Sequence, residues 1–310
     1  MNFLAKLFGP NDIGIDLGAA KIRAWVRGEG LLLEEPSAEY SSNGGVIPDF
    51  DTAKKTLRRC IAKLGRGRLR SPRVIISVHS GITDDEKCMM EKAARSAGAS
   101  VAFLIESPMA AAIGAGLPVS EPKGRMVVNI GASTTEVVVV SLAGIVHSKI
   151  LCIGGDAMDS AIVEYMRGKH DLVIGKQEAE EIKIKIGTAF RPEEELEYEV
   201  KGEAAGDGHP LSVTITSKEV REEALSDVLG QIAGVVRDLL DITEPELAAD
   251  LVDTGIVLTG GGALLRGLDK RLADATGLPV RVAENPAHAT VKGVGVVLCE
   301  LDFLSKFRKK

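Results

Sequence analysis

Two short segments of the chain each combine an apolar run with a glycine-bearing turn. The first run ends in Asp16 and Gly18, and the second leads into Gly131. A further apolar stretch follows each turn, at residues 22–26 and 137–140, so both segments are expected to form hairpins. Glycine has no Cβ, and turns that contain it allow backbone N–H groups to approach a phosphate. Two such turns suggest two half-domains that hold one nucleotide from both sides.

The rest of the chain alternates between strand and helix patterns, which predicts the α/β class. Strands are predicted at residues 31–33, 74–78, 101–105, 196–200, 211–215 and 256–258. Helices are predicted at residues 51–64, 83–97, 178–186 and 217–240, and from Pro108 onward. Thr83 and Glu86 fit a capping box, and Ser217 is the expected N-cap of its helix.

Length and composition favour two domains of a soluble, cytosolic protein. A chain of 310 residues is long for one core. The net charge of −6 argues against a nucleic-acid partner. No apolar run reaches the ~18 residues of a membrane span, and no cleavable signal peptide is visible. The four cysteines form no C-x-x-C pair and are expected to be buried and reduced: Cys60, Cys88, Cys152 and Cys299.

The first eight residues have the pattern of a short amphipathic helix. Its apolar positions, at i, i+4 spacing, are Phe3, Leu4, Leu7 and Phe8. Two helical turns are marginal alone in water, so this helix needs a surface to lie on. That surface is either the protein itself or a membrane interface, and the sequence leaves both open. The basic C-terminus, residues 306–310, is a second candidate for contact with anionic lipid.

Three segments resemble the phosphate and adenosine loops of the actin, chaperone and sugar-kinase ATPases. They are residues 16–18, 129–136 and 258–267. Three further stretches narrow the resemblance to MreB, the bacterial actin family of cell-shape control. They are residues 108–117, 181–187 and 277–286. The resemblance covers nearly the whole chain, and six stretches in the same order make it specific.

The resemblance implies an actin-like fold, with ATP and Mg²⁺ in the cleft between two related α/β domains. Asp16 would orient the water shell of Mg²⁺, as a hard oxygen ligand can. Gly18 and Gly131 would admit the phosphates, and Thr135 would line the second loop. Lys183 would flank the base or ribose. Three glycines would let the adenosine lie against backbone: Gly260, Gly261 and Gly262.

By the same resemblance, residues 1–150 form the first actin-like domain and residues 151–310 the second. The second carries an insert at about residues 190–252, and a C-terminal helix is expected to return to the first domain. Family members carry a small subdomain in the first domain, where this chain has only residues 38–44. That segment is long enough for a turn only. Part of the cleft wall and part of a filament contact surface are therefore expected to be missing.

Several positions depart from the family pattern. Where the family has an acid that positions the attacking water, this chain has Ser107, and a neutral hydroxyl cannot act as a general base near neutral pH. Glu106 lies one place earlier, and neighbouring side chains at a strand end point in different directions. Ser107 is instead the expected N-cap of the helix that opens at Pro108. In the second loop, Asn129 replaces an aspartate.

Two basic features also stand out. Arg23, on the strand after the first loop, either reaches phosphate or is a surface charge. The basic stretch of residues 66–73, which contains Leu69, stands where the family has a membrane-touching loop. Together with the N-terminal helix, this stretch favours a membrane-facing surface on the first domain.

The leading hypothesis is an MreB-like cytoskeletal or scaffold protein on the inner membrane face, which binds ATP and hydrolyses it weakly or not at all. Expected partners are copies of itself or an intact MreB-type homologue, inner-membrane lipid, and envelope or cell-wall assembly proteins. Three alternatives stay open: an active filament-forming ATPase, an actin-like adaptor of a pilus or envelope assembly system, and a small-molecule kinase. The kinase would need an acid in the cleft to accept a hydroxyl proton, and the sequence does not identify one.

Overall fold

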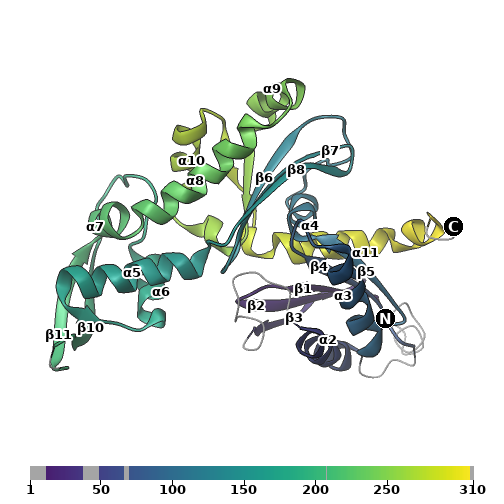
Figure 1. Cartoon of the computed structure of the whole chain (residues 1–310), viewed down its shortest axis with the longest axis horizontal. Helices are drawn as coiled ribbons and strands as arrows, with labels where there is room; N and C mark the ends of the chain where they lie inside the picture. The colour runs from purple at the N-terminus through teal and green to yellow at the C-terminus, as the bar shows by residue number, and fades with distance from the viewer. Residues whose placement is uncertain (1–11, 38–48, 66–69, 207, 308–310) are drawn as a thin grey trace.

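The computed structural model describes residues 12–37, 49–65, 70–206 and 208–307, which form two lobes (Figure 1). Each lobe contains a five-stranded sheet, in the order β3-β2-β1-β4-β5 in the first lobe and β13-β12-β6-β7-β8 in the second. In both sheets an antiparallel meander of three consecutive strands is extended by two parallel strands. The α/β class is confirmed, and the duplicated topology matches the twofold pattern of the glycine-bearing hairpins.

The strands of the first lobe are β1 (Asp12–Leu17), β2 (Lys21–Val26), β3 (Gly30–Pro36), β4 (Arg73–Val78) and β5 (Val101–Glu106). Those of the second sheet are β6 (Arg125–Ile130), β7 (Thr135–Ser141), β8 (Gly144–Leu151), β12 (Ile256–Thr259) and β13 (Val280–Val282). A small third sheet at the far end of the second lobe contains β9 (Leu172–Val173), β10 (Glu197–Ala204) and β11 (Pro210–Thr216).

Helices α2 (Phe50–Leu64) and α3 (Asp84–Ser96) belong to the first lobe. The second lobe contains α5 (Gly155–His170), α6 (Lys176–Lys185), α7 (Ser217–Glu219), α8 (Ser226–Asp241), α9 (Pro245–Thr254) and α10 (Leu268–Thr276). Two helices, α4 (Ser107–Gly114) and α11 (Ala289–Phe307), lie side by side between the two sheets (Figure 1).

The two faces of β1 show how the first sheet is covered. Ile13 and Ile15 point into the core that α2 and α3 form on one face. Gly14 points to the other face, where a Cβ would lie 2.4 Å from Cγ1 of Val294 on α11. Because side chains alternate along a strand, Asp16 shares the α11 face with Gly14. The Asp16 carboxylate therefore lies on the side of the sheet that faces the second lobe.

The second sheet is covered in the same way. Alternate residues of β6 and β7, such as Val128 and Val137, join the large core beneath α5, α6 and α8. Their neighbours Val127 and Val138 pack on the opposite face against Ala112 of α4. Both sheets thus use α4 or α11 as a cover, so these two helices join the lobes.

The domain boundary expected at residue 150 does not separate the two sheets, because the second sheet already begins at residue 125. Strands β6, β7 and β8 hydrogen-bond within the second sheet, and β6 pairs with β12. The chain therefore leaves the first sheet after β5 and enters the second at residue 125. The resemblance to a duplicated fold did not show where the duplication begins, because α4 between the two sheets serves both lobes.

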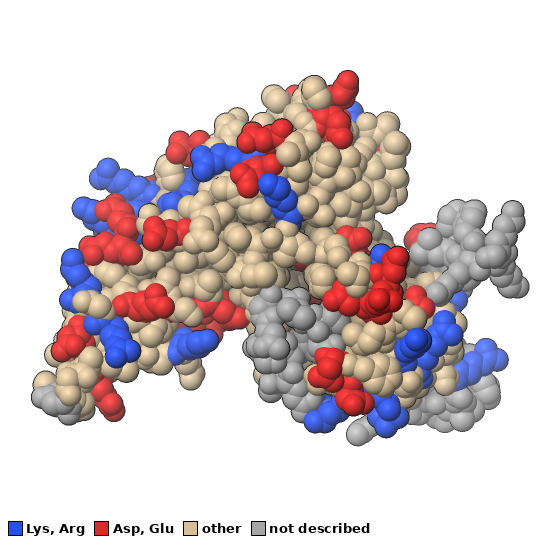
Figure 2. Space-filling model, in the orientation of Figure 1, with Lys and Arg blue, Asp and Glu red and all other residues tan. Residues whose placement is uncertain are grey.

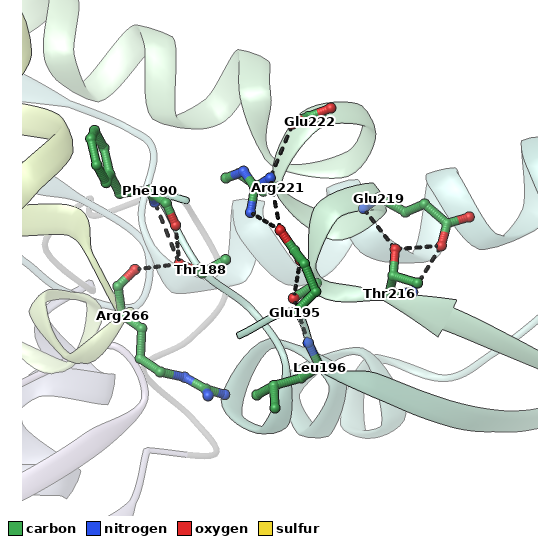
Figure 3. Close-up of polar contacts among 10 residues, drawn as sticks. Thr188, Phe190, Glu195, Leu196, Thr216, Glu219, Arg221, Glu222 and Arg266 are labelled. Atoms are coloured by element: carbon green, nitrogen blue, oxygen red, sulfur yellow. Dashed lines mark hydrogen bonds and ion pairs between the residues drawn. The ribbon is translucent and has the colours of Figure 1, made fainter. Parts of the chain in front are cut away.

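The caps of two helices differ from the sequence expectation. Thr216, and not Ser217, caps the helix at residue 217, because the Thr216 hydroxyl accepts a hydrogen bond from the Glu219 N–H in a capping box (Figure 3). Ser217 Oγ instead donates to Glu195 at 2.5 Å. The capping box at Thr83 and Glu86 is confirmed. The helix predicted at residues 217–240 is present, but a π-helical turn at Val220–Ala224 interrupts it.

The cysteines are less buried than expected. Cys60 packs in the first core, whereas Cys88, Cys152 and Cys299 are exposed. Each exposed cysteine sits on a helix face or strand end that the chain turns to solvent, which residue type alone does not reveal. All four are free thiols.

The surface gives two further observations. Within the described residues, no helix is long and apolar enough to cross a membrane. On the face in Figure 2, lysine and arginine are interspersed with aspartate and glutamate over both lobes. The N-terminal positions Phe3, Leu4, Leu7 and Phe8 lie outside the described residues, as do Leu69 and residues 38–44.

Candidate functional site

A cavity of about 630 Å³ lies between the two lobes. The β1–β2 turn and the end of β4 line it from the first lobe, and the β6–β7 turn, α5, α6 and the segment after β12 line it from the second. This volume is in the range of cofactor and small-ligand sites. The cavity brings together most of the residues predicted from the sequence: Asp16, Gly18, Ser107, Gly131, Lys183, Gly260, Gly261 and Gly262.

Asp16 is a buried carboxylate at the end of β1. Its Oδ1 accepts a hydrogen bond from Ser77 Oγ at 2.7 Å. Burial raises the pKa of Asp16, while the Ser77 hydroxyl and the charges of Arg23 and His288 lower it. A cation that entered the cavity beside Asp16 would further favour the charged form.

The two glycine-bearing turns have tight backbones. At Gly18 a Cβ would lie 2.7 Å from the carbonyl oxygen of Lys21, so a side chain there would force the turn to shift. In the second turn, the Gly131 N–H donates to the carbonyl oxygen of Thr134 at 2.8 Å. Both turns thus bring backbone to the cavity wall at Gly18 and Gly131, where no Cβ stands between the chain and a ligand.

Helix α5 begins directly against the second turn. The Gly155 N–H donates to the carbonyl oxygen of Gly131 at 3.0 Å, and a Cβ at Gly154 would lie 2.6 Å from that oxygen. Ser133 Oγ donates to Asp156 Oδ2 at 3.0 Å, which fastens the turn to the first turn of the helix. The backbone N–H groups of Gly155 and Asp156 both bond to carbonyl oxygens of the turn, so the turn and the start of α5 form one continuous wall of the cavity.

Glu136 is a cavity residue that the sequence did not single out. It is almost fully buried on β7, and its Oε1 accepts a hydrogen bond from the Ser80 N–H of the first lobe at 2.7 Å. Asn129 Nδ2 donates to Glu136 Oε2 at 3.4 Å, and Asn129 Oδ1 accepts from Thr259 Oγ1 at 3.2 Å. The amide at position 129 thus bridges an acceptor and a donor, and Glu136 ties the lobes together at the cavity. Burial raises its pKa, and the bonds from Ser80 and Asn129 oppose that shift.

Lys183 lines the cavity from α6, and its side chain is already paired. Its Nζ lies 2.6 Å from Asp159 Oδ1 and donates to the carbonyl oxygen of Gly155 at 3.2 Å. Burial raises the pKa of Asp159, and the hydrogen bond from Lys183 lowers it. The pair holds α6 against α5, so the lysine stem forms a fixed side wall of the cavity.

The glycines after β12 meet two different demands. Gly260 has φ +82°, and a Cβ there would lie 2.2 Å from the carbonyl oxygen of Ile130, so other residues are excluded. Gly262 is equally close to the Ile130 side chain. Around Gly261, by contrast, a Cβ would meet open space. Gly261 lines the cavity, so its backbone is accessible to a ligand there.

Ser107 lines the cavity, but not as the predicted N-cap. Helix α4 begins at Ser107 itself, Glu106 is the flanking residue, and no side chain caps this end. The expectation failed because the strand continues to Glu106 and leaves no extended residue between it and the helix. Glu106 is half-buried and does not line the cavity, and burial raises its pKa.

Thr135 is not at the cavity surface. It is fully buried, and its Oγ1 donates to the carbonyl oxygen of Ile153 at 2.8 Å. This hydrogen bond holds β7 against the segment that follows β8. Side chains alternate along β7, and that of Thr135 points into the interior. Glu136, the next residue, takes the cavity-facing position that the sequence assigned to Thr135. The continuous apolar run from Val137 to Val140 gave no sign of this, since both faces of β7 are buried.

Comparison with known proteins identifies the family. The chain matches the family described as MreB/Mbl protein over residues 41–306. It is 41% identical to the cell shape-determining protein MreB of Escherichia coli strain K12, with 94% of each protein covered. It is 38% identical to the cell shape-determining protein Mbl of Bacillus subtilis strain 168, with 95% of this chain and 98% of the relative covered.

Solved structures agree with this assignment. The chain superimposes on the crystal structure of MreB5 of Spiroplasma citri bound to AMPPNP with a TM-score of 0.89 and 27% identity, covering 96% of this chain and 99% of the other. A MamK double helical filament matches with a TM-score of 0.75 and 19% identity, over 94% of this chain and 98% of MamK, and supports the fold alone. The fold is actin-like, and the chain belongs to the MreB/Mbl family.

Proposed function

We propose that this protein binds an adenine nucleotide in the cavity between its lobes and acts as a cell-shape scaffold. The observation that carries the proposal is the cavity itself, which is lined by both glycine-bearing turns and by the three glycines after β12. The AMPPNP-bound and ADP-bound structures of Spiroplasma citri MreB5 support the ligand class. The names of the relatives from Escherichia coli and Bacillus subtilis support the cellular role.

The residues present fit a nucleotide with Mg²⁺. Among the residues that the structure describes, no cluster of three or more His, Cys, Asp or Glu side chains could hold a metal alone. Mg²⁺ does not need one, because it commonly keeps several waters and binds one or two carboxylates plus phosphates. Asp16 supplies such a carboxylate, and Gly18 and Gly131 leave room for phosphates beside it. Bound Mg²⁺ would neutralise phosphate charge, and Asp16 would orient its waters.

Titration with ATP tests the proposal directly. Isothermal calorimetry of the full chain, with and without Mg²⁺, should show binding at one site. A Gly260→Val variant should lose it, because the added side chain would collide with the Ile130 backbone. Gly168→Val, at a helical glycine with no atoms within 4 Å, is the matched control. Failure of the wild-type protein to bind ATP under either condition would refute nucleotide binding.

Weak hydrolysis is part of the same proposal. Ser107 offers no base, and Glu106 does not reach the cavity. Glu136 does line the cavity, but it is engaged by Ser80 and Asn129. Family membership favours the scaffold over the kinase and the pilus adaptor. Asp16 would therefore serve to orient the ligand, and Glu136 to hold the two lobes together.

Membrane association is expected to depend on the N-terminal segment. Deleting residues 1–8 should release the protein from anionic liposomes, because each of the apolar side chains there could contribute up to ~1.5–3 kcal/mol on full burial and less at an interface. Liposome flotation measures this. Lys6→Gln, which removes charge and keeps the apolar face, should retain most binding. Unchanged flotation of the deletion variant would favour docking of the segment on the protein's own surface.

Self-assembly is expected to be weak. The alignment with Escherichia coli MreB spans 328 positions, whereas this chain has 310 residues, so the relative contains residues without a counterpart here. A shortened first domain would account for this difference in length. Stable protein–protein interfaces usually bury on the order of 1,200 Å² or more. Losing part of the filament contact surface on the first domain should therefore weaken assembly.

Electron microscopy of the purified protein with ATP should show no long double filaments at low micromolar concentration. The Escherichia coli relative in the same buffer is the comparison. Filaments that incorporate this protein only when the relative is added would support a modulator of another protein's filament. Long filaments of this protein alone would contradict weak assembly.

A further inference from the structure

A row of polar side chains crosses the first sheet at the cavity. In the strand register Glu34 of β3 is opposite Arg23 of β2, Arg23 is opposite Asp16 of β1, and Asp16 is opposite Ser77 of β4. Directly opposite residues of neighbouring strands place their side chains on the same face. Arg23, Asp16 and Ser77 all line the cavity. The row therefore sets a guanidinium immediately beside the buried carboxylate of the site.

Arg23 is poorly satisfied where it stands. Its side chain is only 14% exposed, and its Nε is buried without a hydrogen-bond partner. The nearest carboxylate oxygen recorded for it, Glu34 Oε1, is 3.6 Å from Nη2, which is beyond hydrogen-bond distance. A buried guanidinium with unused donors is costly unless an acceptor reaches it.

Glu34 does not meet that need, because other groups already hold it. Lys21 Nζ lies 2.8 Å from Oε1, and His288 Nε2 lies 3.0 Å from Oε2. These two contacts lower the pKa of Glu34 to about 2, and Arg23 contributes less than either. Glu34 thus holds Lys21 and His288 in place. The side chain of Arg23 lines the cavity.

We propose that Arg23 is a ligand for the phosphate chain of the bound nucleotide, and that its charge lets the nucleotide bind without a divalent cation. The inference rests on the proposed function, since it presupposes a nucleotide in this cavity. A guanidinium matches phosphate oxygens with paired N–H donors and stays charged at all relevant pH values. The neutral amide of Asn129 strengthens the effect, because it adds no negative charge opposite the phosphates.

Calorimetric titration of ATP into the full chain in EDTA, and again in Mg²⁺, tests the proposal. The wild-type protein should bind in both buffers, and the two affinities should lie within about tenfold of each other. A charged hydrogen-bonding pair changes an affinity by about tenfold or more, so Arg23 should offset most of the loss of Mg²⁺. Arg23→Gln should weaken binding in EDTA by about 10–100-fold and make it strongly dependent on Mg²⁺. Arg23→Lys, which keeps the charge but loses the planar fork, should fall between the two.

Arg95→Gln is the matched control, because Arg95 pairs with Glu91 on α3 and does not line the cavity. It should bind as the wild type does, and the urea midpoints of all variants should show that each is folded. Equal ATP affinity of Arg23→Gln and the wild type in EDTA would overturn the proposal. So would wild-type binding that requires Mg²⁺, although nucleotide binding itself would then stand. No wild-type binding in either buffer would overturn the proposed function as well.

Discussion

Replacing Ser107 with glutamate should raise the steady-state rate of ATP hydrolysis by about 10²–10⁴-fold, the usual contribution of a positioned base. Ser107 lines the cavity at the first residue of α4, so a carboxylate there would reach the nucleotide space. The N-terminal end of a helix favours a negative charge, and no side-chain hydrogen bond caps this end of α4. Phosphate release at saturating ATP and Mg²⁺ measures the effect.

Ser107→Gln is the control for this prediction. It has nearly the same size and shape as glutamate but cannot accept a proton, so its rate should match the wild type. Calorimetry should confirm that both variants still bind ATP. A wild-type rate equal to that of the Escherichia coli relative would contradict the prediction. So would a Ser107→Glu variant no faster than Ser107→Gln.

Gly293→Ala should lower the free energy of unfolding by about 1–3 kcal/mol, or more if the backbones cannot part. A Cβ on Gly293 of α11 would lie 1.8 Å from the carbonyl oxygen of Ala110 on α4. Gly114 of α4 faces Ala289 of α11 in the same way, so neither helix can move aside locally. Because these helices join the lobes, the clash would strain both. Urea unfolding followed by circular dichroism measures the change.

The matched control is Gly230→Ala, the same substitution in α8. There a Cβ meets no atom within 4 Å, and alanine is the better helix former by roughly 1 kcal/mol. Gly230→Ala should therefore raise the urea midpoint while Gly293→Ala lowers it. Equal midpoints for Gly293→Ala and the wild type would show that α4 and α11 are not in backbone contact.

The sequence predicted those parts of the fold that depend on local pattern. The two glycine-bearing hairpins became β1–β2 and β6–β7, and the residues at their turns meet at one cavity. Gly260 was singled out by the family resemblance, and its positive φ and close approach to Ile130 show why no other residue fits there. The capping box of α3 was also predictable, because it depends only on Thr83 and Glu86, three residues apart in the sequence.

Features that depend on tertiary packing were not predictable in this way. Thr216 and Ser217 are both good N-cap residues, and only the backbone bend at Thr216 decides between them. Glu136 and Thr135 are adjacent on a strand buried on both faces, so no polar alternation indicated which one faces the cavity. The pairing of Glu136 with Ser80 joins residues from different lobes, and a pattern in one segment cannot show it.

The position of α11 has a consequence for the order of synthesis. The face of the first sheet that carries Gly14 is covered by Val294 and Leu298 of α11, a helix that follows every strand of both sheets in the chain. A nascent chain emerging from the ribosome therefore leaves that face uncovered until the elements from β2 to β13 have been made. The first lobe is thus synthesised before the second, but it cannot complete its packing until α11 has been made.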